Sequence, residues 1–591
     1  MVLVPPFVLL DDARPGGGSA RLYADPVRIV TADTLEQVRP ALEELRAARA
    51  EGLDAAGYIS YEAGAALEPR VGTSDGFARP LLWFGLFRGW RDVAREDVPA
   101  LLPDPDGAWA GAPRPLISQA DYAGQFDRVA GLIRAGDIYQ ANLTFRAAVP
   151  FLGAPAALYA LLRRQSLAGH GALVATGAEW LLSLSPELFF TLESGRLTAR
   201  PMKGTAVRGA TPEEDAALAR ALVEDPKQRA ENLMIVDLMR NDLSRVAKAG
   251  SVRVPALFTV ETYPTVHQMT STVVADLAEG LDAVDALAAL FPCGSVTGAP
   301  KIRAMQIIAD VEHGPRDAYT GSIGRIDAAG DASFNVAIRT LNVKNGADHA
   351  ALGLGSGLVA DSQAFEEWQE CLAKGGFVTA GQPRFDLIET MRFDPEAGIV
   401  LLERHLARMK ASAETFGFTF DRHTTRNELQ AATFRLRAPS RVRLVASASG
   451  ALSIGIAPLP APPAQPVDTM VMPLPVAPQD FRLRHKTTRR HFLDEARRRS
   501  GAYEVVFTDP EGFLTEGSFT SIFVRRGGQL LTPPLARGLL PGVLRTELLA
   551  TGEAVEADLR PEDLAGGFLI GNALRGLVSA VTIAPDAKAA L

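Results

Sequence analysis

The chain has 591 residues, of which 47% are hydrophobic and 22% are charged, and its formal net charge is -8. This length predicts several domains, because about 150 residues per domain is usual, and the composition is that of a globular protein. The negative charge and the absence of a basic stripe argue against a nucleic-acid partner. No stretch reads as a signal peptide or a membrane span, so we expect a cytoplasmic enzyme with no membrane partner. Cys293 and Cys371 are too few for a metal cluster or a disulfide framework.

Secondary structure of both kinds is predicted along the chain. The apolar run Val2–Leu10 predicts a first strand, and the Pro-, Asp- and Gly-rich stretch Glu96–Pro115 predicts a connection to a larger portion. Hydrophobic spacing predicts further elements, which in chain order are strands at Leu181–Leu184 and Leu188–Leu192, a helix at Ala230–Ala249, a strand at Ser251–Val254 and a helix at Gln363–Lys374. The fold class is therefore mixed α/β (α+β).

One break divides the sequence. Gly375 and Gly376 are expected to end a helix, and Pro383 disfavours its resumption. We therefore expect a first domain at 1–376, with an N-terminal portion at 1–115 and a core at 116–376, a linker at 377–383, and a second domain at 384–591. Within the second domain, Pro458–Pro463 predicts a semi-rigid connector between two lobes.

Two lysines are candidate covalent catalysts, Lys203 in Arg200–Ala206 and Lys486 in His485–Thr487. An amine that attacks carbon must lose its proton, so such a lysine tends to lie in a partly desolvated pocket. Most lysines instead lie on the surface.

Carboxylates on two predicted helices suggest a metal. Glu231 lies on one helix, and Glu367 and Glu370 leave the same face of another because they are three residues apart. Such a set suits Mg²⁺, which keeps several waters and also binds substrate oxygens. The alternative is an exposed pair between Glu370 and Lys374, one turn later.

A series of motifs in the first domain resembles the chorismate-utilising enzymes, which include anthranilate, isochorismate, salicylate and aminodeoxychorismate synthases. The motifs follow in order over Asp121–Lys374 and are Gly136–Leu143, Ser185–Phe189, Arg200–Thr205, Ala230–Leu243, Gly298–Met305, Ala337–Thr340 and Gly355–Ser362. The resemblance implies a β-sandwich-like core with flanking helices and chorismate as the substrate.

Lys203 is the residue that distinguishes branches of this family. The resemblance implies that the anthranilate branch has alanine there and the aminodeoxychorismate branch has lysine. Ammonia that attacks C2 of chorismate expels the C4 hydroxyl and leads towards anthranilate. If lysine attacks C2 first, ammonia can enter at C4 and expel the lysine, which gives 4-amino-4-deoxychorismate.

Other roles follow from the resemblance by position. Glu187 resembles the general acid/base. The local sequence alone leaves an alternative, in which Glu187 is an N-cap-like carboxylate after Pro186. Glu231 and Glu370 resemble the Mg²⁺ ligands, with Glu367 close by. The expected substrate contacts are Arg339 and Tyr319, which would hold the enolpyruvyl carboxylate, Gly355 and Gly357, whose amides would approach a carboxylate, and Thr205.

Two positions depart from the family pattern. Gln268 stands where relatives usually have histidine beside the leaving hydroxyl, and Gln228 stands where some have glutamate. The adjacent His267 is expected to point away, since neighbouring residues on a strand face opposite sides. The chain also lacks a cysteine in a glutaminase setting, which implies that a separate glutamine amidotransferase subunit supplies ammonia.

The second domain resembles class IV pyridoxal phosphate enzymes, which implies a two-lobed fold. The motifs are Phe385–Arg392, Glu403–Arg408, His485–Thr487, Leu514–Ser518, Thr532–Pro534 and Gly538–Gly542. By position, Lys486 resembles the lysine that binds pyridoxal 5'-phosphate, Glu516 the carboxylate under its ring nitrogen and Arg408 a phosphate partner. Amides near Gly542 and Val543 would face the phosphate at a helix start. Ser521 replaces a common asparagine.

Together the resemblances imply a bifunctional enzyme of 4-aminobenzoate synthesis for folate, with Mg²⁺ and pyridoxal phosphate as cofactors. The first domain would make aminodeoxychorismate, and the second would eliminate pyruvate from it. Asn572–Gly576 also looks similar to the lyase. Two alternatives keep the first activity and make the second domain a class IV transaminase or a non-catalytic docking module for the amidotransferase.

Overall fold

A computed structural model describes residues 3–584 apart from 73–75, 79 and 264–265, so Val2 of the predicted first strand lies outside the described residues. The chain forms two compact units. The first comprises Met1–Pro105, Ala112–Phe151 and Pro155–Gly381, and the second comprises Asp106–Gly111, Leu152–Ala154 and Gln382–Leu591. The second unit therefore includes two short segments from the N-terminal part of the chain.

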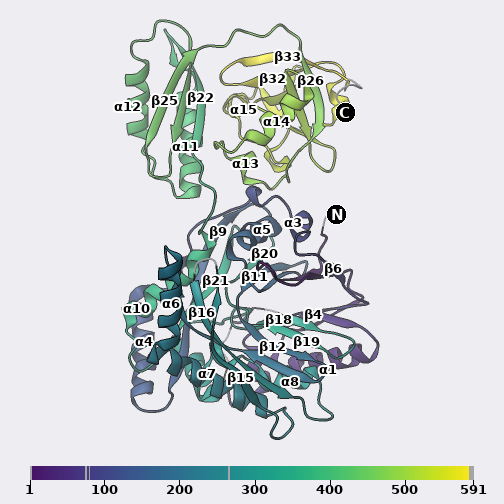
Figure 1. The fold of residues 1–591 in the computed structure, drawn as a ribbon. Helices are drawn as coiled ribbons and strands as arrows, with labels where there is room; N and C mark the ends of the chain where they lie inside the picture. The colour runs from purple at the N-terminus through teal and green to yellow at the C-terminus, as the bar shows by residue number, and fades with distance from the viewer. Residues whose placement is uncertain (1–2, 73–75, 79, 264–265, 585–591) are drawn as a thin grey trace. The chain divides into compact units, whose positions relative to one another are not determined.

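The first unit contains two large antiparallel sheets (Figure 1). One runs in the order β17 (Gly298–Ala299), β9 (Gln140–Leu152), β21 (His349–Leu358), β20 (Thr340–Lys344), β11 (Glu179–Ser185), β10 (His170–Ala175), β1 (Phe7–Asp11), β2 (Ala20–Ala24) and β6 (Arg91–Val93), with β8 (Arg114–Pro115) beside β9. The other runs in the order β14 (Met202–Val207), β16 (Val266–Asp276), β13 (Arg196–Arg200), β12 (Leu188–Glu193), β19 (Ala332–Asn335), β18 (Ser322–Ile326), β4 (Asp54–Ile59), β5 (Leu82–Phe87) and β3 (Arg28–Ala32), with β15 (Arg253–Thr262) beside β16.

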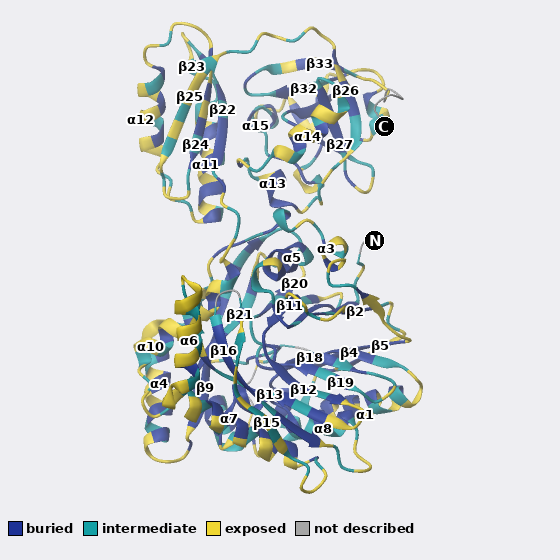
Figure 2. Cartoon of the chain, in the orientation of Figure 1, coloured by how far each residue is buried: buried dark blue, intermediate teal, exposed yellow. Residues whose placement is uncertain are grey.

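The two sheets pack on each other. Val8 and Val174 of the first sheet and Tyr58 and Trp83 of the second belong to one buried cluster. A larger cluster lies where the second sheet meets α1 (Leu35–Ala50), α7 (Pro226–Ser244) and α8 (Ala283–Leu290). The remaining helices of the unit are α2 (Ala63–Leu67), α3 (Val98–Leu101), α4 (Gln119–Arg134), α5 (Pro155–Ser166), α6 (Pro212–Glu224), α9 (Lys301–Val311) and α10 (Ala364–Gly375). The predicted sandwich-like core with flanking helices is confirmed, and Figure 2 shows its buried strands beside the exposed outer sides of α4, α6 and α10.

Most predicted elements of this unit are present, but α7 differs from its predicted range. It begins at Pro226 rather than Ala230, because the Asp225 side chain accepts bonds from the amides of Lys227 and Gln228 and proline suits the first helical position. It ends at Ser244, before the predicted Ala249. The strand expected at Ser251 begins instead at Arg253 and continues to Thr262.

The second unit has two lobes, as the connector predicts. The first lobe has the sheet order β23 (Gly398–Ile399), β22 (Leu387–Asp394), β24 (Ser440–Ala446), β25 (Leu452–Pro458), with α11 (Leu402–Phe416) and α12 (Arg422–Thr433). The second has the order β28 (Leu514–Gly517), β27 (Glu504–Thr508), β26 (Val467–Pro473), β33 (Gly576–Thr582), β32 (Phe568–Asn572), β29 (Ser521–Arg526), β30 (Gln529–Thr532), β31 (Ala554–Glu556), with α13 (Phe481–Arg484), α14 (His491–Ser500) and α15 (Val543–Ala550). Pro458–Pro463 begins at the last residue of β25 and leads towards β26, and so joins the lobes.

The two N-terminal segments of the second unit complete the hydrophobic core of its first lobe. The ring of Trp109 lies 5.0 Å from that of Phe416, and Leu152 packs on the same cluster. Asp106 forms an ion pair of 2.8 Å with Arg489. These residues therefore cover part of a core whose other members come from beyond residue 384.

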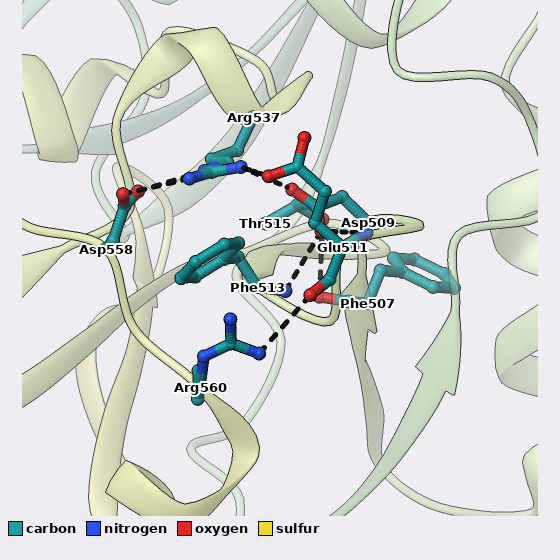
Figure 3. A network of polar contacts seen from close by, with 8 residues as sticks. All are labelled: Phe507, Asp509, Glu511, Phe513, Thr515, Arg537, Asp558 and Arg560. Atoms are coloured by element: carbon teal, nitrogen blue, oxygen red, sulfur yellow. Dashed lines mark hydrogen bonds and ion pairs between the residues drawn. The ribbon is translucent and has the colours of Figure 1, made fainter.

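A polar network fixes the segment before α15 (Figure 3). The guanidinium of Arg537 bonds to three carboxylates and lies 3.8 Å from the centre of an aromatic ring, and these partners are Asp509 (3.2 Å), Glu511 (2.8 Å), Asp558 (2.9 Å) and Phe513. Arg537 thus ties the β27–β28 turn to the start of the Gly538–Gly542 motif. Within the described ranges, no helix is long and apolar enough to cross a membrane.

Candidate active sites

A cavity of about 860 Å³ in the first unit brings the predicted residues of this unit together. Those that line it are Glu187, Lys203, Thr205, Glu231, Tyr319, Arg339, Gly355, Gly357, Glu367 and Glu370. They come from β14, α7, β21, α10 and the loops between strands. Residues that are distant in sequence therefore meet in one place, as the succession of motifs implies.

Lys203 is held through its backbone. The Nδ2 atom of Asn232, on α7, donates to the Lys203 carbonyl at 3.2 Å, and the Nε2 atom of Gln268 donates to the carbonyl of Gly204 at 2.9 Å. Gly204 has φ +96°, which favours glycine. The side chain is partly buried, and this burial, with the nearby charge of Lys374, lowers the pKa of the Lys203 amine.

Gly357 allows a close approach to that amine. A Cβ at this position would lie 2.7 Å from Lys203 Nζ, so a larger residue would displace the lysine. Gly353, four residues earlier on β21, is close to Tyr319 in the same way, because a Cβ there would lie 2.1 Å from the tyrosine ring. The glycines of this strand therefore make room for two of the cavity's functional side chains.

Glu187 is buried at the cavity wall, between β11 and β12, so no helix follows it and an N-cap role does not apply. Its Oε1 atom has no hydrogen-bond partner within the described part of the chain. Burial raises the pKa of Glu187 to about 7, while Ser295 and Lys203 act in the opposite direction. A carboxyl with this pKa can both give and take a proton near neutral pH.

The carboxylates of α7 and α10 are in different environments. Glu370 forms a 2.8 Å ion pair with Lys374, which is the alternative that the sequence left open, yet it also lines the cavity. Glu367 accepts a bond from Ser362 through Oε1, while its buried Oε2 lacks a partner among the described atoms. Burial raises the pKa of Glu231, and the charge of Glu370 adds to this effect.

These carboxylates fit a weakly coordinated Mg²⁺. Among the described residues, no group of three or more His, Cys, Asp or Glu side chains is close enough to hold a metal ion. Mg²⁺ usually needs only one or two protein carboxylates, with waters and substrate oxygens as its other ligands. The proximity of Glu231 to Glu370 and the unpartnered oxygen of Glu367 are consistent with that mode.

Arg339 and Tyr319 present a cationic group and a phenol to the cavity. Arg339 has φ +49°, an uncommon conformation for a non-glycine residue that sets the direction of its side chain, and burial lowers its pKa. The tyrosine is also sheltered, and burial raises its pKa. A charged donor with little water around it is suited to a carboxylate.

Gln268 lies in the cavity and His267 does not. Gln268 accepts a bond from the Thr205 hydroxyl at 3.0 Å while it donates to Gly204, so it positions the segment that carries Lys203. His267 is buried on the opposite side of β16, where it bonds to Asp215 at 2.8 Å and to Thr262 at 3.1 Å. The prediction that His267 points elsewhere is therefore confirmed.

A second cavity, of about 640 Å³, lies in the second unit and is lined by all five residues predicted to bind the cofactor: Arg408, Lys486, Glu516, Gly542 and Val543. Burial lowers the pKa of the Lys486 amine to about 7, and the charges of Arg408, Arg490 and Arg443 lower it further, against the effect of Glu389. Gly542 caps the start of α15.

Glu389 organises one wall of this cavity and was not identified from the sequence. It accepts bonds from Arg408 Nε at 2.8 Å and Nη2 at 2.7 Å, and from the imidazole of His405 at 2.6 Å. Burial alone would raise its pKa, but the charges of Arg408 and His405 hold it well below the ordinary value. Arg408 also donates to the carbonyl of Pro541, so its guanidinium is fixed.

The residues of this cavity fit pyridoxal phosphate. Glu516 is buried, with an Oε1 atom that has no hydrogen-bond partner in the described chain and lies 3.9 Å from Arg490. Burial raises its pKa to about 7. A buried carboxyl with a free oxygen suits a ring nitrogen, a lysine with a lowered pKa suits an aldehyde, and Arg408 with the start of α15 suits a phosphate.

Residues 6–380 match the family model described as chorismate binding enzyme. The chain belongs to the chorismate binding enzyme family. Residues 386–583 match the model for amino-transferase class IV, so the C-terminal unit is a class IV domain, as predicted, and such a domain implies pyridoxal phosphate.

Individual relatives cover only part of the chain. An aminodeoxychorismate synthase component 1 from Klebsiella aerogenes is 45% identical over 261 residues, which are 44% of this chain and 57% of that protein. An anthranilate synthase component 1 from Aquifex aeolicus is 43% identical over 242 residues, 41% of this chain and 49% of that protein. The chain thus spans about half the length of these curated relatives.

A solved structure has the fold of the first unit. The crystal structure of anthranilate synthase component I from Streptococcus pneumoniae TIGR4 has a TM-score of 0.53 and 28% identity, and the match covers 64% of this chain and 93% of that one. Aminodeoxychorismate synthases and anthranilate synthases are therefore both similar to this chain. The choice between their two reactions depends on the residues of the chain itself.

Proposed function

We propose that the chain makes 4-aminobenzoate from chorismate and ammonia in two steps, one in each cavity. The observation that carries the proposal is Lys203, an amine with a lowered pKa in the same cavity as the buried acid Glu187. A nucleophile and a proton donor near each other are what the covalent route to C4 amination requires.

In the first step, the neutral amine of Lys203 attacks C2 of chorismate and the ring double bonds shift. The C4 hydroxyl leaves as water after it takes the proton of Glu187. Ammonia then attacks C4, the double bonds return, and the bond between C2 and Lys203 breaks with its electron pair remaining on the lysine nitrogen. The lysine is regenerated, and the product is 4-amino-4-deoxychorismate.

The other residues of the first cavity bind and orient the substrate in this proposal. Arg339 and Tyr319 hold the enolpyruvyl carboxylate, and the amides of Gly355 and Gly357 face a carboxylate. Glu231 and Glu370, with Glu367 close by, would hold Mg²⁺. That ion would supply positive charge to the ring carboxylate and to the oxygen that leaves.

In the second step, the C-terminal unit removes the proton from C4 of aminodeoxychorismate, and the bond between C3 and the ether oxygen breaks. The enolpyruvyl group leaves with that oxygen and takes up a proton to become pyruvate, and the ring becomes aromatic. Pyridoxal phosphate, when bound, supplies an electron sink for the amine-bearing carbon. Lys486, with a pKa of about 7, takes the proton from C4. Glu516 would hold the ring nitrogen of the cofactor, and Arg408 with the amides at Gly542 and Val543 would hold its phosphate.

Ammonia is proposed to come from a separate glutamine amidotransferase subunit. The two cysteines of the chain are buried, and burial raises the pKa of Cys293 to about 12 and of Cys371 to about 11. A glutaminase nucleophile needs a thiolate instead. The isolated chain is therefore expected to use ammonium and not glutamine.

The test is to incubate the protein with chorismate, ammonium, Mg²⁺ and pyridoxal phosphate and to identify the aromatic product by chromatography. Wild-type protein is expected to give 4-aminobenzoate and pyruvate. Lys203→Ala should lose C4 amination, and anthranilate can form instead, whereas Lys248→Ala, an exposed lysine outside the cavity, should match wild type. Unchanged 4-aminobenzoate from Lys203→Ala refutes the covalent route.

The alternatives for the second unit are tested in the same preparation. Turnover of 2-oxo acids with an amino donor would indicate a transaminase. A protein that accumulates aminodeoxychorismate and shows no visible cofactor band would indicate a non-catalytic docking module.

A further inference from the structure

One face of the first lobe's sheet presents arginines to the second cavity. Along β24, Ser440, Val442 and Leu444 are buried, whereas Arg441 and Arg443 point from the other face and line the cavity. The alternation is that of a strand with one face in a core and one in solvent. The two guanidinium groups are two residues apart and therefore leave the strand on the same side.

Their neighbours across the sheet do not neutralise them. On β22, Arg392 is directly opposite Arg441, and Thr390 is opposite Arg443. On β25, the small residues Ala457 and Gly455 hold the corresponding positions. Like charges on directly opposite residues destabilise a sheet. The arrangement is therefore unfavourable in the absence of an anion.

No ion pair in the described chain involves Arg441 or Arg443, so each is available to a ligand. Arg443 is near Lys486, because its charge is among those that lower the pKa of that lysine. The cavity as a whole is basic, since seven of its lining residues are Lys or Arg and two, Asp494 and Glu516, are acidic. Arg408 and the start of α15, on another wall of the cavity, suit the cofactor phosphate, so Arg441 and Arg443 are not needed for that group.

We propose that Arg441 and Arg443 form a carboxylate subsite that makes the second cavity selective for a dicarboxylate substrate. This inference rests on the proposed function and names the substrate feature that the cavity recognises. Aminodeoxychorismate carries one carboxylate on the ring and one on the enolpyruvyl group. It therefore has two carboxylates, whereas an ordinary monocarboxylic amino acid has one. Arginine forks match carboxylates in a bidentate manner, and the nearby Lys486 places the bound group beside the reacting carbon.

The direct test is binding of an unreactive dicarboxylate, 3-(carboxymethoxy)benzoate, to the full-length protein loaded with pyridoxal phosphate. A change in the visible cofactor band, which reports on the second cavity and not on the first, should show that wild type binds it at least about tenfold more tightly than 3-methoxybenzoate, which lacks the second carboxylate. The double variant Arg441→Ala/Arg443→Ala should bind the dicarboxylate about 10- to 100-fold more weakly, as expected for lost hydrogen bonds between charged groups. Arg443→Lys should retain part of the affinity.

Two controls make the result specific. Arg435→Ala removes an exposed arginine of the same lobe that does not line the cavity, so it should bind the probe like wild type. The double variant should keep the visible cofactor band. Without ligand, the C-terminal unit of the double variant, followed by loss of the cofactor band, should unfold at a midpoint no lower than in wild type, because like charges have been removed. The increase in this midpoint that the dicarboxylate causes in wild type should be lost in the variant.

Kinetics then separate this inference from the proposed function. With aminodeoxychorismate, the double variant should raise KM by about 10- to 100-fold and leave kcat within about threefold of wild type. Wild-type KM or wild-type affinity for the dicarboxylate in the double variant overturns the subsite, as does equal binding of the two probes by wild type. If wild type has no lyase activity but binds the dicarboxylate through the arginine pair, the subsite stands and the proposed reaction fails.

Discussion

Asn232 offers the sharpest perturbation of the first cavity, because it acts on Lys203 without contacting the proposed reacting atoms. Its Nδ2 atom donates to the Lys203 carbonyl at 3.2 Å, and its Oδ1 atom accepts from the Ser271 hydroxyl at 2.6 Å. The side chain is 1% exposed. Asn232→Ala therefore removes these two bonds, together with a longer one of 3.5 Å from Nδ2 to the Met269 carbonyl, and leaves their partners unsatisfied.

The size of the effect follows from these contacts. Each lost bond costs about 1 kcal/mol net, and unsatisfied buried partners add about 1 to 3 kcal/mol. From the two shorter bonds we expect the free energy of unfolding to fall by about 3 to 5 kcal/mol. Displacement of a reacting group by about 1 Å can cost a hundredfold in rate, so C4 amination should slow by about 10- to 100-fold, with a larger share of anthranilate among the products.

The assay measures both quantities. Urea unfolding gives the stability. Product analysis with chorismate and ammonium gives the rate and the ratio of 4-amino to 2-amino products, with a separate aminodeoxychorismate lyase added in excess so that the second reaction does not limit the rate. Asn241→Ala, at an exposed position of the same helix, is the matched control and should change stability by less than about 0.5 kcal/mol. If Asn232→Ala is destabilised but keeps the wild-type rate and product ratio, Asn232 does not position Lys203.

Three further predictions follow from the two cavities. Because burial raises the pKa of Glu187 to about 7, its acid form is present below that pH and lost above it, so kcat/KM for the first reaction should decline above about pH 7. Glu187→Gln should abolish this decline and lower turnover by about 10²- to 10⁴-fold. An unchanged pH profile in the variant argues against Glu187 as the proton donor. Glu231→Gln should raise the Mg²⁺ concentration needed for half-maximal rate, whereas exposed Glu366→Gln should not, and equal requirements would remove Glu231 from the ligand set. Lys486→Ala should lose the visible cofactor band and accumulate aminodeoxychorismate while chorismate consumption continues, and normal 4-aminobenzoate output would contradict the assignment.

Sequence reasoning located the cavities because their residues lie in compact motifs. Lys203, Glu231 and Glu370 could be grouped through the resemblance of their motifs to the chorismate-utilising enzymes, whereas helical spacing alone left an exposed Glu370–Lys374 pair as an alternative. The structure brings the three residues to one cavity. Asn232 could not be distinguished, although it is adjacent to Glu231, because its partner is a backbone carbonyl on a different element. Such a bond leaves no sequence pattern.

The same reason explains other omissions. Glu389 lies inside the recognised motif Phe385–Arg392, but its bonds to Arg408 and His405 depend on how β22 packs on α11. The start of α7 was predictable in principle, because aspartate followed by proline is a common helix start. The hydrophobic spacing that defined the predicted helix simply begins later than the helix itself.

The two short segments that join the C-terminal unit have a consequence for protein engineering. A fragment that starts at residue 384 keeps every residue of the second cavity but loses Trp109, Leu152 and Asp106. The ring of Phe416 then loses its contact with Trp109, part of the core becomes exposed, and Arg489 loses its ion pair with Asp106. Cutting the gene at the glycine-rich junction would thus give an isolated class IV unit that is prone to aggregation. Transplanting this unit onto another synthase would likewise require the recipient to supply an aromatic patch in place of the missing segments.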